Sequence, residues 1–184
     1  MLIDAAKSTL LLIDVQDRLL PAMASPAEVE RRCVVLVKAA KLLNVPVTVS
    51  EQYPKGLGRT VPSLAAELGG TATVFEKLAF SCWQDKAMKE HFIAHHETQR
   101  PLVILAGIEA HVCVLQTALD LSAAGFGVFA VADAMSSRAA ASEQLAHARM
   151  RQAGVALVNT EMAVFELLRK AGTPEFKALS ALIR

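Results

Sequence analysis

The 184-residue sequence contains only three cysteines, and an odd number leaves at least one of them without a disulfide partner. A secreted scaffold held together by disulfides is therefore not expected, and we predict reduced thiols in a cytoplasmic protein. An excess of charge of one sign is also missing, because 19 basic and 18 acidic side chains give a formal net charge of +1. A general nucleic-acid-binding protein would carry a clear positive excess, so we expect no nucleic-acid partner.

Long apolar runs and a recognisable leader are missing as well. Unbroken apolar stretches such as Leu102 to Ala106 are far shorter than the ~20 residues that a membrane-spanning helix needs. Residues Met1 to Asp4 include an acidic side chain and no basic one, so we expect no signal peptide. Hydrophobic residues nevertheless make up 53% of the chain, which excludes wholesale disorder. We therefore predict one compact domain over residues 1–184, with no membrane partner.

Short apolar runs alternate with longer segments of helical periodicity along the chain. The runs are continuous rather than alternating, which is typical of strands that are buried on both faces of a parallel sheet. They cover residues 9–13, 45–49, 71–75, 102–106, 128–131 and 155–158. Strands and helices that alternate at this spacing predict an α/β fold, with a mostly parallel sheet and helices on both of its faces.

Residues that start and stop helices lie in the gaps between these runs. Ser25 offers an N-cap before Pro26, and Asn44 is expected to end the helix that follows. Gly172 is expected to stop the last helix of the pattern. The expected helices cover residues 26–43, 114–124, 139–153 and 161–170.

Three chemically reactive side chains are predicted at one edge of this sheet. Asp14 ends the first predicted strand, Lys77 lies just past the third, and Cys113 follows the fourth. Loops that leave the carboxyl ends of parallel strands line the ligand crevice in sheets of this type. The polar stretch 51–60 also follows a predicted strand, and its length favours a pocket wall over an ordinary surface connection.

These side chains suit nucleophilic catalysis. A cysteine near a helix N-terminus and close to a lysine ammonium should have a lowered pKa and more thiolate. Asp14 would accept the thiol proton and return it to a leaving group, while Lys77 would hold both anions in place. Backbone N–H groups of the turn before Cys113 would stabilise an oxyanion. The alternative is that Cys113 only packs, beside an incidental Asp14–Lys77 ion pair, and for an arbitrary α/β domain this alternative is favoured.

Five segments that follow one another in order shift the balance toward catalysis. They are residues 11–16 (LLIDVQ), 51–58 (EQYPKGLG), 76–77 (EK) together with 80–82 (FSC), 107–114 (GIEAHVCV) and 132–138 (ADAMSSR). Together they resemble the isochorismatase-like cysteine hydrolases, close to the isochorismatase domain-containing subgroup. The resemblance extends over about residues 8–165, and the combination of segments is what makes it specific.

The resemblance implies a fold and a set of catalytic residues. The fold is a six-stranded parallel sheet flanked by helices, in a Rossmann-like three-layer arrangement. The triad consists of Asp14 as the acid/base, Lys77 as the positioning cation and Cys113 as the nucleophile. A cis peptide is implied between Ile108 and Glu109, with the N–H groups of Glu109 and Cys113 directed at an oxyanion. Homo-oligomers are common in this family and the apolar composition permits one, so we expect a homo-oligomer.

Two departures from the family pattern narrow the function. Family members that hydrolyse nicotinamide carry one aspartate and two histidines as metal ligands near the segment aligned with Glu51 to Tyr53, where this chain has no histidine. We therefore expect no catalytic metal, and the lack of a phosphate-cradling glycine loop gives no reason to expect a nucleotide cofactor. Members that cleave isochorismate itself lack the cysteine, so Cys113 favours acyl transfer at an amide or related carbonyl.

The sequence thus predicts a metal-independent hydrolase. Cys113 would attack a small amide or related acyl substrate and form a thioester, which water then hydrolyses. Gln16, Tyr53, Phe80 and Trp83 are candidate substrate-binding residues, with helix packing an equally good role for Trp83. The alternative function is a non-catalytic or redox-sensing protein that retains the fold. A nuclease role conflicts with the charge balance.

The remaining cysteines and histidines receive other roles. Cys33 lies in an apolar helix and is expected in the core, while Cys82 is expected in the pocket wall rather than as a second reactive thiol. His111 lies two residues before Cys113 and offers an alternative Cys–His site, but the Asp–Lys–Cys triad is preferred. Three further histidines are interpreted as a solvated helix end rather than as metal ligands, namely His91, His95 and His96.

Overall fold

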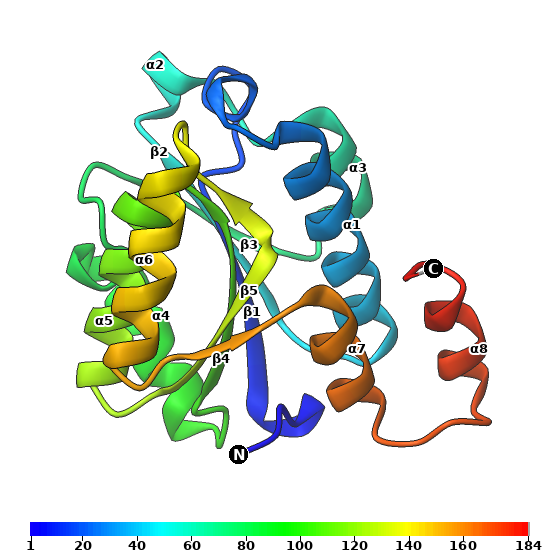
Figure 1. Ribbon diagram of the computed structural model, residues 1–184. Helices are drawn as coiled ribbons and strands as arrows, with labels where there is room; N and C mark the ends of the chain where they lie inside the picture. Colours follow the sequence, from blue (N-terminus) through cyan, green and yellow to red (C-terminus); the bar gives the residue numbers. More distant parts are fainter. Residues whose placement is uncertain (184) are drawn as a thin grey trace.

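Six strands form one parallel sheet in the computed structural model, which describes residues 1–183 (Figure 1). The strands are β1 (Ser8–Ile13), β2 (Val47–Gln52), β3 (Thr73–Lys77), β4 (Leu102–Ile108), β5 (Gly127–Ser136) and β6 (Ala156–Val158). Their order across the sheet is β3-β2-β1-β4-β5-β6, and every pair of neighbours is parallel. The predicted six-stranded sheet is therefore confirmed, and the order of the strands changes direction between β1 and β4.

Helices cover both faces of the sheet. Helices α1, α3 and α7 lie on one face and α4, α5 and α6 on the other, as Figure 1 shows. The helices are α1 (Pro26–Leu42), α2 (Pro54–Leu57), α3 (Pro62–Leu68), α4 (Lys86–Glu97), α5 (Leu115–Ala123), α6 (Ala140–Gln152), α7 (Thr160–Leu168) and α8 (Pro174–Ser180). The predicted three-layer α/β arrangement is confirmed. None of the helices within residues 1–183 has the length and apolar character needed to cross a membrane.

Strand β1 illustrates why a continuous apolar run becomes a central strand. Leu10 and Leu12 pack on the side of α1, whereas Leu11 and Ile13 pack on the side of α4 and α5. Each of the four side chains is at most 1% exposed. Burying a leucine or isoleucine fully contributes about 1.5–3 kcal/mol to folding. A strand covered on both faces therefore needs apolar residues at every position, as the sequence provides.

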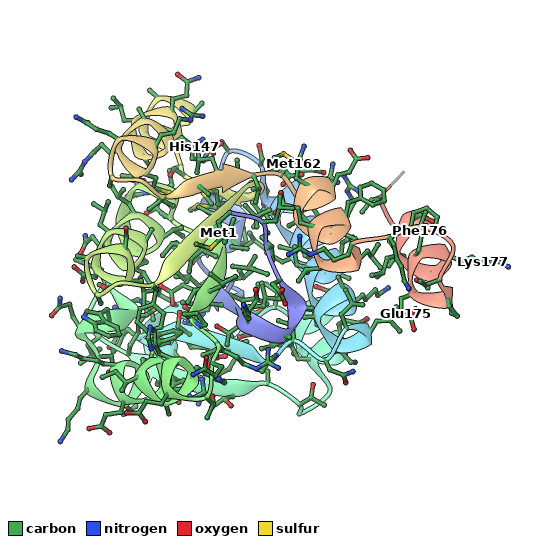
Figure 2. The ribbon with its side chains drawn as sticks, turned by 90° about the horizontal axis from the view of Figure 1, so that it is seen from below. Met1, His147, Met162, Glu175, Phe176 and Lys177 are labelled. Carbon is green, nitrogen blue, oxygen red and sulfur yellow. The ribbon has the colours of Figure 1, made fainter. Side chains whose placement is uncertain are left out.

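Helix α8 lies outside these layers. It packs on α1 and α7 rather than on the sheet, and its buried Leu179 joins Val35 of α1 and Val164 of α7 in a small separate cluster. Figure 2 shows the labelled Phe176 of α8 on the opposite side of the molecule from His147 of α6. The apolar pattern did not predict α8 or the short α3. Neither helix contains a long apolar run, and each begins at a proline.

Four strands, β2 to β5, end further along the chain than expected. Strand β2 continues to Gln52, and Lys77 is the last residue of β3 rather than a residue just past it. Glu51 pairs with Glu76 and Gln52 with Lys77 in the ladder, so polar residues extend both strands. When the last residues of a strand are polar, a prediction from apolar runs places the end of that strand too early.

The helix ends correct two further expectations. Ser25 precedes α1 as expected, but its side chain makes no capping hydrogen bond, and its carbonyl instead accepts the amide N–H of Val29. Helix α7 ends at Leu168, because Arg169 adopts a φ of +63° and turns the chain. Gly172 therefore does not stop this helix.

Candidate active site

Asp14, Lys77 and Cys113 come together at the carboxyl edge of the sheet. Asp14 directly follows β1, Lys77 ends β3, and Cys113 lies in a π-helical turn (Ala110–Val114) that follows β4. Strands β1 and β4 are neighbours at the point where the strand order reverses, which is where open α/β sheets place their ligand crevices. The three residues are 0, 3 and 5% exposed, respectively, so any reaction here takes place largely out of water.

Asp14 and Lys77 form a buried ion pair. Lys77 Nζ donates to Asp14 Oδ2 at 2.7 Å, and neither side chain has exposed surface. Ser50 Oγ donates to the other carboxylate oxygen, Oδ1, at 2.7 Å. Asp14 has a φ of +54°, a left-handed conformation that aspartate tolerates better than most residues, and its N–H donates to the carbonyl of Ser50. Backbone and side-chain contacts together hold this carboxylate in one orientation.

Lys77 has further acceptors around its ammonium. Gln52 Oε1 lies 2.8 Å from Nζ, and the carbonyl oxygens of Ala79 and Phe80 lie at 3.2 and 3.1 Å. Burial would lower the pKa of Lys77, but attraction to Asp14 and to the nearby thiols outweighs it, so that the pKa is raised. The lysine therefore remains charged. Sequence reasoning missed Ser50 and Gln52, although polar residues late in a buried strand next to β1 were a usable signal.

The Cys113 thiol does not have the lowered pKa that its position suggested. Burial raises its pKa, and the adjacent Asp14 carboxylate raises it further, against the opposing effect of Lys77. The expectation was wrong because burial, the largest effect, and the charge of Asp14 together outweigh the attraction of the lysine. Cys113 is therefore a protonated thiol at neutral pH, next to a carboxylate that can accept its proton.

Gly107 brings β4 close to β1 beside Asp14. A Cβ atom at this position would overlap the carbonyl oxygen of Ile13, and the φ of Gly107 is +123°, which side chains rarely allow. Only glycine fits here. The close approach sets the spacing between the end of β1 and the turn that carries the thiol.

The turn before Cys113 contains the cis peptide between Ile108 and Glu109. The carbonyl of Glu109 then accepts the N–H groups of Val112 and Val114, at 3.1 and 3.2 Å. The turn leads directly into α5, so Cys113 lies at the start of a continuous helical segment.

The carboxamide of Gln16 is hydrogen-bonded to the backbone. It is fully buried, and its Nε2 donates to the carbonyls of Gln52 and Gly58 at 3.0 and 2.7 Å. Its Oε1 accepts the N–H of Gln52 at 2.8 Å. The carboxamide is thus occupied with backbone groups and fastens the segment after β2 to the end of β1. Gln16 therefore has a structural role at the site, and its expected role in substrate binding stays a prediction.

The three aromatic candidates occupy different environments. Tyr53 and Phe80 are 52% and 54% exposed. The backbone carbonyl oxygen of Phe80 accepts a hydrogen bond from the ammonium of Lys77. Trp83 packs against Phe126, with ring centroids 5.6 Å apart, and Lys89 Nζ lies 5.1 Å from its ring centre. Trp83 thus takes part in packing, one of its two expected roles, while Tyr53 and Phe80 are exposed, and the substrate-binding role of the three stays a prediction.

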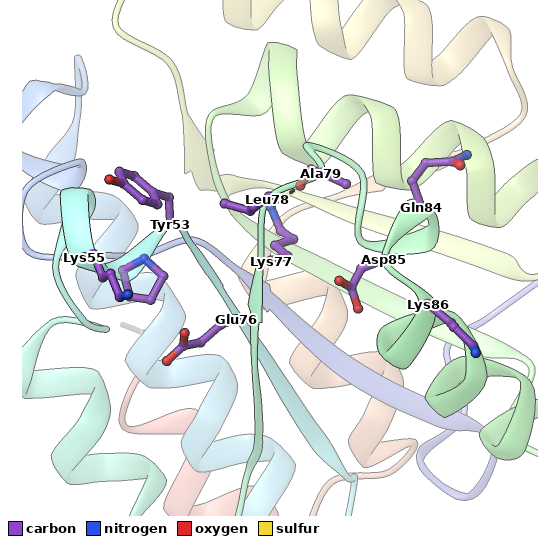
Figure 3. Close-up of a pocket in the computed structure, with 10 residues that line it drawn as sticks. Tyr53, Lys55, Glu76, Lys77, Leu78, Ala79, Gln84, Asp85 and Lys86 are labelled. Atoms are coloured by element: carbon purple, nitrogen blue, oxygen red, sulfur yellow. Dashed lines mark hydrogen bonds between the residues drawn. The ribbon is translucent and has the colours of Figure 1, made fainter.

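A cavity of about 510 Å³ lies along the edge strand β3, next to the end that bears Lys77. Figure 3 shows Tyr53 and Lys55 on one side of this strand and Asp85 and Lys86 on the other. Part of the polar stretch 51–60, residues 53–55, forms one wall, as the sequence suggested. Asp14 and Cys113 do not line this cavity. Of the three clustered residues, Lys77 alone lines it.

The residues at the family's metal position do not fit a metal ion. Glu51 is buried, and its Oε1 accepts hydrogen bonds from the N–H and hydroxyl of Thr60, both at 2.8 Å. Its Oε2 accepts from Arg59 Nη1 at 2.8 Å, so a guanidinium already provides the positive charge. Within residues 1–183, no group of three or more His, Cys, Asp or Glu side chains is placed to hold a metal.

The other two cysteines have raised pKa values. Cys33 lies in the core as expected, and burial raises its pKa. Cys82 is fully buried near Lys77 and Asp14, and burial raises its pKa to about 11 in spite of the lysine. Its N–H donates to Thr117 Oγ1, one turn beyond Cys113. Cys82 is therefore a protonated part of the buried wall of the site.

The histidines differ from their expected roles. His111 is directed to Ser137, with Nδ1 2.8 Å from its Oγ, and is thereby engaged away from Cys113. His91 and His95 are half-buried rather than solvated, and their Nε2 atoms lie 3.2 Å apart. Burial lowers the pKa of both rings. The sequence interpretation was wrong for this pair, because their helix face packs toward β2, where Thr48 Oγ1 is 2.8 Å from His91 Nε2.

Known proteins resemble this chain over most of its length. The family model of the Isochorismatase domain matches residues 8–162. The secreted isochorismatase effector Isc1 of Phytophthora sojae is 44% identical over 151 residues, which cover 81% of this chain and 71% of that protein.

Solved structures agree with this assignment. The MAR1 ribonuclease of Caenorhabditis elegans has a TM-score of 0.92 and 36% identity, covering 100% of this chain and 92% of that one. The YcaC gene product of Escherichia coli, described as an octameric hydrolase of unknown specificity, has a TM-score of 0.90 and 26% identity, covering 99% and 90%. The sequence match and the shared fold together place this chain in the isochorismatase domain family.

Proposed function

We propose that this chain is a metal-independent cysteine hydrolase that acts on a small amide or related acyl substrate. The observation that carries the proposal is the burial of Cys113 at the same edge of the sheet as the carboxylate of Asp14, which Lys77 holds in place. A thiol, a base and a fixed cation at the start of a helical segment are the groups that acyl transfer requires.

The reaction starts with the attack of Cys113 Sγ on the substrate carbonyl carbon. Asp14 accepts the thiol proton as the S–C bond forms, so that a free thiolate is not needed beforehand. The N–H groups of Glu109 and Cys113 stabilise the carbonyl oxygen as it becomes negative. The tetrahedral intermediate then breaks its C–N bond, and the amine leaves with the proton from Asp14.

Hydrolysis of the thioester completes the cycle. Asp14 removes a proton from water as the oxygen attacks the thioester carbonyl. The C–S bond breaks, the acid is released, and the proton returns to Cys113. Lys77 keeps its charge throughout, and its ammonium holds the Asp14 carboxylate in place at 2.7 Å.

The raised thiol pKa argues against the alternative redox-sensing function. Redox-sensitive cysteines are exposed and rich in thiolate, whereas Cys113 is buried and protonated. The C. elegans relative is described as a ribonuclease. Binding of RNA draws on a positive excess to contact phosphates, and the net charge of +1 here favours a small uncharged substrate.

Self-association and location are part of the same proposal. The E. coli relative is octameric, and exposed apolar side chains such as Leu78 and Val74 on and after the edge strand β3 favour a homo-oligomer. Sedimentation velocity measures this directly, and a monomer at all concentrations would contradict it. We propose a cytoplasmic location on the basis of the unpaired thiols, although the Phytophthora relative is described as secreted.

The function is tested with a panel of small aliphatic and aromatic amides, by measuring ammonia or amine release together with the intact mass of the protein. Wild-type protein should show an acyl adduct on Cys113 with at least one amide. Cys113→Ala and Asp14→Asn should lose turnover by about 10³-fold or more. Cys33→Ala is the matched control, since it removes a buried thiol far from the site. Wild-type turnover in Cys113→Ala would overturn the proposal.

A further inference from the structure

A second set of contacts holds the turn before Cys113 from the side of β5. Ile108, at the end of β4, pairs with Ser136, at the end of β5. The next residues on the two strands, Glu109 and Ser137, therefore leave the sheet side by side. The mechanism above uses the backbone of this turn but makes no use of the side chains that secure it.

The first contact joins Glu109 to Arg138. The Glu109 carboxylate is largely buried, and its Oε2 accepts hydrogen bonds from the Arg138 backbone N–H at 3.2 Å and from Nε at 3.0 Å. The Arg138 side chain is otherwise 66% exposed. An exposed arginine thus meets a nearly buried carboxylate at the residue whose amide lies in the cis peptide.

The second contact joins His111 to Ser137. Their Nδ1 and Oγ atoms lie 2.8 Å apart, and Ser137 is fully buried. The carbonyl of Ser137 accepts the N–H of Ala24 at 3.0 Å. Ser137 is therefore fixed by the rest of the fold and offers a rigid anchor to the turn.

An irregularity in β5 precedes Ser137 and Arg138 in the chain. Between the pairs Leu105–Ala130 and Gly107–Met135, the register shifts, and β5 passes through extra residues that β4 lacks. Asp133 in this irregular stretch caps α7 by accepting the N–H and hydroxyl of Thr160. Asp133 thus ties the irregular part of β5 to α7. The last residues of β5, Met135 and Ser136, pair again with β4 just before the turn begins.

We propose that Ser137 and Arg138 are positioning residues, which hold Glu109 and His111 so that the amides of Glu109 and Cys113 face the developing oxyanion. The inference rests on the proposed function. Neither side chain touches the reacting atoms. Two independent contacts, an ion pair and a hydrogen bond, fix two residues of a turn whose backbone geometry decides how well negative charge is stabilised.

The test compares Arg138→Gln and Ser137→Ala with wild-type protein in two reactions of the same thiol. Acylation of Cys113 by p-nitrophenyl acetate passes through an oxyanion, whereas alkylation by iodoacetamide does not. Removal of one oxyanion donor typically reduces rates by about 10²–10³-fold, so a displaced donor should reduce acylation by about 10–100-fold. Alkylation should change by less than about twofold. On the best amide, kcat should fall while KM stays nearly constant.

Controls separate positioning from stability. Arg149→Gln removes an exposed arginine of α6 that has no ion-pair partner among residues 1–183, and it should react like wild type. Added ethylguanidinium should restore acylation in Arg138→Ala, which a general loss of stability would not allow. Equal acylation rates in Arg138→Gln and wild type would overturn the inference alone. Wild-type Cys113 that is alkylated but never acylated would overturn both the proposed function and the inference.

Discussion

Lys77 Nζ lies 2.7 Å from Asp14 Oδ2, with both side chains fully buried, so each charge depends on the other for its stability in the folded state. Removal of one partner from such a pair typically costs about 3–5 kcal/mol, because the remaining charge is left without compensation. Lys77→Met should therefore lower the free energy of unfolding in urea by about this amount.

The double variant Asp14→Asn/Lys77→Met should recover much of that loss, since asparagine tolerates the left-handed backbone at position 14 and no unpaired charge remains. It should still be inactive. A Lys77→Met protein that is destabilised by less than about 1 kcal/mol would show that water or another group reaches Asp14, against the burial described above.

The two charges next to Cys113 act on its thiol in opposite directions. Asp14 raises the pKa of Cys113 and Lys77 lowers it. Asp14→Asn should therefore increase the rate of alkylation by iodoacetamide at neutral pH while abolishing amide hydrolysis. In wild type, the alkylation rate should still rise with pH well above neutrality. The measurement is the pH profile of alkylation, with Cys113→Ala as the blank, and slower alkylation in Asp14→Asn would contradict the assignment.

Gly107→Ala tests the close approach of β4 to β1. The added methyl group would overlap the Ile13 carbonyl oxygen in a backbone conformation that alanine rarely adopts. Either strand must move, and Asp14 with it, so activity should fall together with stability, the latter by about 1–3 kcal/mol. Gly154→Ala is a matched control, because Gly154 also has a positive φ but has open space where a Cβ would lie. Equal thermal midpoints for the two variants would contradict the argument.

The His91–His95 pair gives a pH dependence of stability. Burial lowers the pKa of both rings in the folded state, whereas an unfolded histidine titrates near pH 6.5. Between that value and the lower folded pKa, the unfolded chain binds more protons, so the free energy of unfolding should decrease as the pH falls below about 6.5. Thermal midpoints between about pH 5 and 7.5 measure this effect.

A variant with both rings replaced, His91→Asn/His95→Asn, should show a smaller change of midpoint over the same range. Part of the slope should remain, since burial also lowers the pKa of His147 on α6. An unchanged slope in the double variant would assign the effect to other groups.

The sequence was sufficient for the sheet and for the three clustered residues. Buried parallel strands require continuous apolar runs, and Asp14 and Lys77 are polar residues at the ends of such runs. The order of the strands then brings those ends together. Cys113 was located by the motif around it, which also matched the family.

Features that depend on long-range pairing were not predictable in the same way. Gln16 looks like a pocket residue from its position after Asp14, but its partners lie 36 and 42 residues away. The raised pKa of Cys113 depends first on how deeply the folded chain buries the thiol and then on its neighbours Asp14 and Lys77. Strand β5 was underestimated because Asp133 interrupts its apolar run, and only the folded chain shows that this residue caps α7.

Strand β3 lies at the edge of the sheet, and Lys77 is its only buried residue. Edge segments with little buried surface open locally at a lower free energy than the centre of a sheet does. A fluctuation that detaches β3 would withdraw Lys77, while Asp14 and Cys113 would stay in place beyond the ends of the central strands β1 and β4. In mild denaturant, the protein would then lose catalytic activity before it unfolds. Amide hydrogen exchange in β3 would measure the population of molecules that are folded but inactive.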